Sequence, residues 1–178
     1  MRVRWMSSLV ALAVAGGCAD AGPAPTDVEA VILPVYTHSP GHEATNFRTH
    51  LSGSEEVPPN GSQAQGQAIF QLQDDGTLAY KLIVANIEEV RQAHIHLAPA
   101  GTNGGIVAWL YPSAPPAVLI PGRTDGILAE GTIADGQVIG GLAGQGVAGL
   151  LAAMQAGNTY ANVHTTQLPG GEVRGQIH

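Results

Sequence analysis

The chain has 178 residues, of which 44% are hydrophobic and only 12% charged, and its formal net charge is −7. This length and hydrophobic share suit one domain with a core of its own and short appendages. The negative charge and the single lysine argue against binding through nucleic-acid phosphates and against electrostatic docking on anionic lipid.

The first 17 residues have the order of an export signal. Arg2 and Arg4 precede a short apolar run, Met6–Val14, which is too short to span a bilayer as a stable helix. Small residues then lead directly to Cys18, the only cysteine of the chain. This order resembles a bacterial lipoprotein signal, so we expect removal of residues 1–17 and a lipid on Cys18 that anchors the protein to the cell envelope. The alternative is an ordinary cleaved signal with an incidental cysteine.

Residues 18–45 have the composition of a tether. The segment 21–26 is rich in proline and glycine, whereas 31–36 is more apolar and is a candidate edge strand. We interpret His38 and His42 as solvated loop residues. Because Cys18 is the only cysteine, the domain that follows has neither a disulfide nor a thiolate metal site.

From residue 46 onward the sequence predicts an all-β domain, 46–178, of Greek-key sandwich or barrel type with one short helix. Alternating apolar and polar residues, separated by turn residues, are typical of half-buried strands. Helical spacing of apolar residues predicts the helix at 144–156, with Gly157 as its C-terminal stop. We expect a proline-rich loop at 112–122 and about eight strands, at 47–51, 66–73, 78–84, 90–97, 106–111, 126–133, 159–165 and 172–177.

Three histidines are the candidate chemistry of the domain. His94 and His96 alternate with apolar neighbours in one predicted strand, so both side chains lie on the same face. His164 lies in a second strand with the same alternation. Imidazole suits copper and zinc, and three imidazole nitrogens with an open position make a plausible site for a divalent ion. The alternative is a set of hydrogen-bonded histidines that only stabilise the packing of strands.

Charged residues near the histidines have less specific roles. Glu172 is a candidate metal ligand, or an acceptor that holds an imidazole in one tautomer. Arg174 shares a face with Glu172, and we expect an ion pair between them rather than catalytic use of the arginine. Glu55 and Glu56 point apart in an extended segment, so they do not form a pair of catalytic acids.

Several stretches together resemble the CHRD domain, a module repeated in the extracellular signalling antagonist chordin and found singly in bacterial exported proteins. The resemblance covers about residues 47–178 and implies a β fold and an exported location, but no reaction. Glu55 stands where glutamine is more typical. The matching pieces are LSGSEEVPP at 51–59, AHIH at 93–96, GILAEG at 126–131, AGNTYANVHT at 156–165 and PGGEVRGQI at 169–177.

A second likeness concerns the candidate site alone. Copper–zinc superoxide dismutases are Greek-key β proteins with a His-x-His pair, a more distant histidine and an arginine near the copper. His94, His96, His164 and Arg174 are similar to that arrangement in outline. The zinc-ligand set and the disulfide cysteines of that family have no evident counterpart, and a shared fold does not confer a function.

These observations favour a lipid-anchored binding module of the cell envelope. Its ligand is either an envelope or extracellular protein, or a copper or zinc ion bound by the three histidines. Two alternatives remain open at this point: a copper-dependent redox enzyme that handles superoxide or a related small oxidant, and a structural adhesion module without metal.

Overall fold

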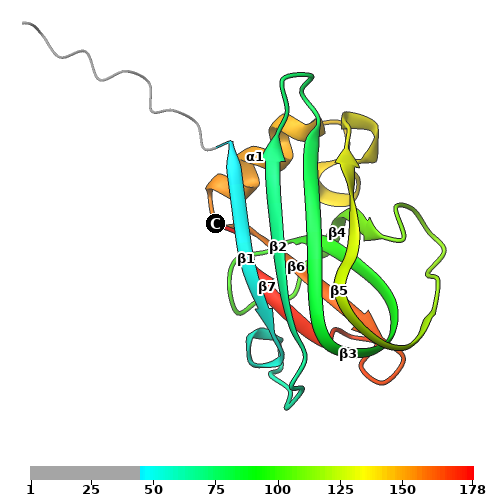
Figure 1. Cartoon of the computed structure of the whole chain (residues 1–178). Coiled ribbons are helices and arrows are strands. Elements are labelled where there is room, and N and C mark those ends of the chain that lie inside the picture. The colour runs from blue at the N-terminus through cyan, green and yellow to red at the C-terminus, as the bar shows by residue number, and fades with distance from the viewer. Residues whose placement is uncertain (1–44) are drawn as a thin grey trace, which may run out of the picture. The chain divides into compact units, whose positions relative to one another are not determined.

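The computed structural model describes residues 45–178, so the predicted signal peptide, Cys18 and nearly all of the tether lie outside the described residues. No helix within that range is long and apolar enough to cross a membrane. Seven strands and one α-helix make up the domain (Figure 1). They are β1 (Asn46–Ser52), β2 (Gln65–Leu72), β3 (Leu78–Leu97), β4 (Gly105–Tyr111), β5 (Ile120–Ile133), α1 (Gly146–Gln155), β6 (Thr159–Thr165) and β7 (Val173–Gln176). Short 3₁₀ turns lie at Gly53–Glu55, Asp135–Gln137 and Gly140–Leu142.

The long strand β3 organises the sheet because it bends and takes part in both layers. Its first arm, 78–85, pairs with β2 and β5, and its second arm, 90–97, pairs with β6 and β4. Figure 1 shows β3 running along one layer, turning at its lower end and returning in the other. Asn86 and Glu89 at the bend have positive φ angles of 58° and 52°, and the register with β5 shifts there. We expected two separate strands at this point, but the chain keeps its ladder through the bend.

The sheet closes on itself like a barrel. Strands β2, β1, β7, β6 and β3 are neighbours in that order, and β3 also pairs with β2. The contact between β1 and β7 is narrow, because Ser52 and Arg174 are its one pair of ladder partners. Gly175 permits this close approach, since a Cβ atom there would overlap the backbone carbonyl of His50. The connection between β4 and β5 brings the chain back beside the first arm of β3.

The core fills the space inside the closed sheet. Alternate residues of each strand point inward, which is why the period-2 pattern was visible in the sequence. The predicted helix is confirmed as α1, whose apolar face is buried at one end of the barrel. The largest fully buried side chains include Leu51, Phe70, Leu82, Ile95, Leu110, Leu150 and Met154. The proline-rich loop ends earlier than expected, because β5 already begins at Ile120.

Candidate functional site

One polar face of the second layer carries the candidate chemistry. On β3 and β6 the residues Ala93, Ile95, Ala161 and Val163 point into the core, so the side chains between them point outward. The register places His94 opposite Asn162, His96 opposite Tyr160 and His164 opposite Gln92. Arg174 follows on β7, opposite Asn162. We call this set the histidine face: His94, His96, Tyr160, Asn162, His164 and Arg174.

Three loops cover the histidine face and remove it from water. They are the loop after β1, the loop between β3 and β4, and the loop between β6 and β7. The side chain of Asn103 donates to the carbonyl of Val57 at 2.8 Å, and that of Asn60 donates to the carbonyl of Glu172 at 3.1 Å. These bonds tie the three loops to one another. As a result β6 is buried along its whole length, on both of its faces.

The three predicted histidines come together under these loops. Their side chains are 0%, 8% and 6% exposed at His94, His96 and His164, and one ring nitrogen from each lies within 4.8 Å of the others. Nδ1 of His94 is 3.2 Å from Nε2 of His164. Two nitrogens bound to one tetrahedral ion at about 2.0–2.1 Å lie roughly 3.4 Å apart, so this pair already has a suitable spacing.

Backbone carbonyls orient two of the three imidazoles. Nδ1 of His96 is 2.9 Å from the carbonyl oxygen of Gly104, and Nδ1 of His164 is 2.9 Å from that of Pro169. A carbonyl only accepts, so both Nδ1 atoms carry the hydrogen and both Nε2 atoms present a lone pair. The Nε2 atom of His164 then accepts from Nδ1–H of His94. The nitrogens available to an ion are thus Nε2 of His96, Nε2 of His164 and, once its hydrogen has moved to Nε2 of the same ring, Nδ1 of His94.

Burial keeps these imidazoles neutral. Loss of hydration and, to a smaller extent, the neighbouring histidines together lower the pKa of His94 to about 3. Burial also lowers the pKa of His164 to about 4, although its hydrogen bond to Pro169 opposes the shift. The pKa of His96 is lowered chiefly by burial as well. Neutral imidazole is the form that binds a metal ion, so protons do not compete for this cluster at neutral pH.

Two of these buried histidines have a ring nitrogen without a partner. Nε2 of His94 and Nε2 of His96 are buried and make no hydrogen bond within the described residues. A buried polar atom without a partner costs free energy, typically about 1–3 kcal/mol. A bound ion would satisfy the lone pair of His96 and would replace the single His94–His164 hydrogen bond with two metal–nitrogen bonds. The donor set therefore fits copper or zinc.

Arg174 and Glu172 differ from their predicted roles. The guanidinium of Arg174 lies 3.4 Å from the centre of the Tyr160 ring and donates to the carbonyl of Thr102 and the side chain of Asn103. The Glu172 carboxylate accepts from the Ser62 hydroxyl at 2.7 Å. The expected Glu172–Arg174 ion pair is wrong: the ion pairs of residues 45–178 join Lys81 to Glu130 and Arg123 to Asp125. Both side chains instead form hydrogen bonds with loop residues that are far away in the sequence.

Sequence reasoning missed the buried acid of the site. Glu56 is 6% exposed, whereas its neighbour Glu55 is exposed, and its Oε1 atom has no hydrogen-bond partner among residues 45–178. Burial raises the pKa of Glu56 to about 7, although the charge of Arg174 opposes the shift. Its carboxylate fills the space that a side chain at Gly171 would need. Adjacent acids that point apart were visible in the sequence, but which one points inward was not.

Tyr160 and Trp109 complete the aromatic surroundings of the imidazoles. The Tyr160 ring stacks on His96 with ring centres 4.8 Å apart and planes 7° apart. Trp109, half-buried on β4, contacts His94 edge to face with ring centres 4.3 Å apart. These contacts fix the planes of two imidazoles, because each ring has an aromatic neighbour on one side. The alternation of apolar and polar residues in the sequence does not predict that Tyr160 and Trp109 contact the imidazoles.

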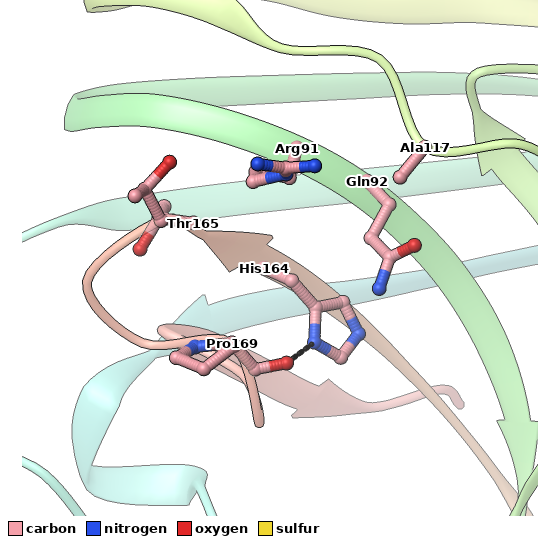
Figure 2. A pocket seen from close by; sticks show the side chains of 7 residues that line it. Arg91, Gln92, Ala117, His164, Thr165 and Pro169 are labelled. Atoms are coloured by element: carbon pink, nitrogen blue, oxygen red, sulfur yellow. Dashed lines mark hydrogen bonds between the residues drawn. The ribbon is translucent and has the colours of Figure 1, made fainter.

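The histidine face reaches solvent through a pocket beside His164. It has a volume of about 300 Å³ and lies where β3 enters its second arm and β6 ends. Figure 2 shows the His164 ring between Gln92 and Pro169, with its hydrogen bond to Pro169 drawn. The lining residues are Arg91, Gln92, Ala117, His164, Thr165, Thr166 and Pro169.

Comparison with known proteins gives a family and no closer relative. The sequence model of the CHRD domain matches residues 47–177, which is most of the chain. Neither the curated proteins nor the solved structures contain a significant match.

The buried acid predicts a pH-dependent stability. The folded-state pKa of Glu56 is raised from 4.5 to about 7, so its contribution to the free energy of unfolding falls as the pH rises through that window. Glu56→Gln removes this titration. The stability of the wild type relative to Glu56→Gln should fall by roughly 2–3 kcal/mol between pH 4.5 and 8, measured by urea unfolding. Glu55→Gln at the exposed neighbour is the control, and an equal pH dependence in both variants would contradict the burial of Glu56.

Proposed function

This chain belongs to the CHRD domain family, and we propose that its domain binds a copper or zinc ion through His94, His96 and His164. One observation carries the proposal. Three buried, neutral imidazoles bring one nitrogen each within 4.8 Å of one another, and backbone carbonyls direct the lone pairs of two of them. A bound ion would also satisfy the buried lone pair on Nε2 of His96, which has no partner among the described residues.

The donor set favours these two metals over calcium or magnesium. It consists of imidazole nitrogen alone, which suits copper and zinc, whereas calcium and magnesium require oxygen ligands. The three ligands leave a coordination position free, as in catalytic zinc sites. Between the two metals, intrinsic affinity favours Cu(II).

A second candidate function is redox chemistry at a bound copper ion. The pocket beside His164 favours it, because a small reactant could approach the free position of the ion through it. Copper supplies the one-electron chemistry in such a site, and the chain's own residues hold the ion and limit access to it. Repeated reduction and reoxidation of the copper-loaded protein, with turnover of superoxide, would distinguish this function from plain binding.

Metal binding should require each histidine of the cluster. Replacing His164 or His96 with glutamine removes one of three ligands, and we expect at least a ~100-fold loss of Cu(II) and Zn(II) affinity, more than changes to an outer partner of a ligand usually cause. His50→Gln, at an exposed histidine on β1, should bind one ion with unchanged affinity. Trp109 contacts His94, so quenching of its fluorescence by copper is a direct measurement.

The full chain should be purified without a histidine tag, and its metal content counted by elemental analysis. Circular dichroism establishes that each variant is folded. Absence of stoichiometric binding, or equal binding by the His164→Gln and His50→Gln variants, would overturn the proposal. The domain would then be a metal-free binding module for an envelope or extracellular protein.

The affinity should also persist at mildly acidic pH. The pKa values of His94 and His164 are lowered to about 3 and 4, and that of His96 is lowered too, so protons compete for these rings less than for exposed histidines at mildly acidic pH. We expect less than a tenfold change in Zn(II) affinity between pH 7 and 5.5. Three exposed histidines with ordinary pKa values would lose affinity on the order of several hundredfold over that range. Competition with a chelator whose own pH dependence is known measures the Zn(II) affinity at each pH.

We also propose that the domain is held at the cell envelope by a lipid on Cys18. The sequence order of residues 1–18 supports this, together with the absence of any other cysteine. In a bacterial host the full chain should fractionate with membranes, whereas Cys18→Ala should not. Equal distribution of the two proteins would contradict the anchor.

A further inference from the structure

The pocket beside the histidine face has a chemical character of its own. Its walls combine the imidazole of His164 and the amide of Gln92 with the apolar surfaces of Ala117 and Pro169. The loop that carries Ala117 is held in place because the Val118 N–H donates to the Arg91 carbonyl at 3.1 Å. At about 300 Å³ the pocket is at the lower end of the range for small-molecule sites.

Arg91 is a positive charge at this pocket without an ion-pair partner. Among the described residues, Lys81 and Arg123 form ion pairs, and Arg174 is buried against Tyr160. Arg91 is exposed and joins neither pair. Glu89, two residues earlier on β3, already has a partner: its Oε1 atom accepts from the backbone N–H of Gly122 at 2.7 Å. The guanidinium of Arg91 is therefore available to an anion from solution.

We infer that this pocket binds a small monocarboxylate. Its carboxylate lies against the Arg91 guanidinium, which presents paired N–H donors that match a carboxylate. Its apolar part lies against Ala117 and Pro169. Arg91 is the one arginine or lysine among the described residues that line the pocket, and its single positive charge favours one negative charge over the two of a phosphate ester. The size of the pocket limits the ligand to about the volume of a small aromatic or branched acid.

The pocket also links this ligand to the proposed metal site. His164 lines the pocket with one edge of its ring and faces His94 with its Nε2 atom. This part of the inference rests on the proposed function: an ion held by the three histidines would lie at the His164 wall of the pocket, and its positive charge would strengthen binding of the anion. Without an ion, Arg91 alone supplies the attraction.

Benzoate and its neutral counterpart benzamide test the inference on the full chain. We expect benzoate to shift the backbone amide resonances of Thr165, Thr166 and Gln92 in the metal-free protein. Arg91→Gln should weaken benzoate binding about tenfold and leave the weaker binding of benzamide unchanged, because only the carboxylate has a charge-assisted bond to lose. Arg48→Gln removes an exposed arginine from β1, outside this pocket, and should leave both affinities unchanged.

Equal benzoate affinity in the wild type and Arg91→Gln would overturn the inference, as would shifts confined to other parts of the domain. The same benzoate titration with zinc present separates the carboxylate pocket from the proposed metal site. Tighter benzoate binding with zinc supports the link between the two sites, and unchanged binding in a zinc-loaded protein rejects that link. If zinc itself does not bind, the metal proposal fails, whereas the result for Arg91 in the metal-free protein still decides the carboxylate pocket.

Discussion

Two hydrogen bonds to backbone carbonyls, from His96 to Gly104 and from His164 to Pro169, determine what the histidine face can do. Each bond fixes a tautomer and leaves a lone pair on Nε2, and Nε2 of His164 lies 3.2 Å from Nδ1 of His94. Both carbonyls belong to loops that also cover the face, so the groups that orient the imidazoles are the groups that exclude water from them. The same loops therefore cause both the orientation and the burial of the imidazoles. Burial in turn lowers the pKa values of His94 and His164, so protons do not occupy these rings at neutral pH.

The bend of β3 makes this arrangement possible. One continuous strand supplies a wall of the barrel with its first arm and the His-x-His pair with its second. The core residues Ala93 and Ile95 flank His94 and hold that arm against the interior. His94 and His96 thus lie on a strand rather than on a loop, and His164 lies on the neighbouring strand β6, which is buried along its whole length. A site built on strands holds its geometry more closely than one built on loops.

The sequence predicted what depends on local periodicity. Alternation placed His94, His96 and His164 on polar faces, and the helix and the all-β class followed from the same kind of pattern. What it could not predict depends on contacts between distant loops. Glu172 bonds to Ser62 and Arg174 to Thr102 and Asn103, so the expected ion pair between them does not form. The continuity of β3 depends on left-handed conformations at Asn86 and Glu89, for which asparagine and glutamate give only a weak signal. The burial of Glu56 likewise depends on its packing against Gly171.

The central claim is that the three imidazoles are neutral, oriented and directed at one point. Long-range ¹H–¹⁵N NMR of the histidine rings tests it most directly, before and after addition of one equivalent of zinc. The account predicts Nδ1–H tautomers for His96 and His164 at pH 7, and zinc-induced shifts at Nε2 of both and at Nδ1 of His94. Protonated rings, the opposite tautomers, or zinc-induced shifts confined to His50 and His178 would contradict it.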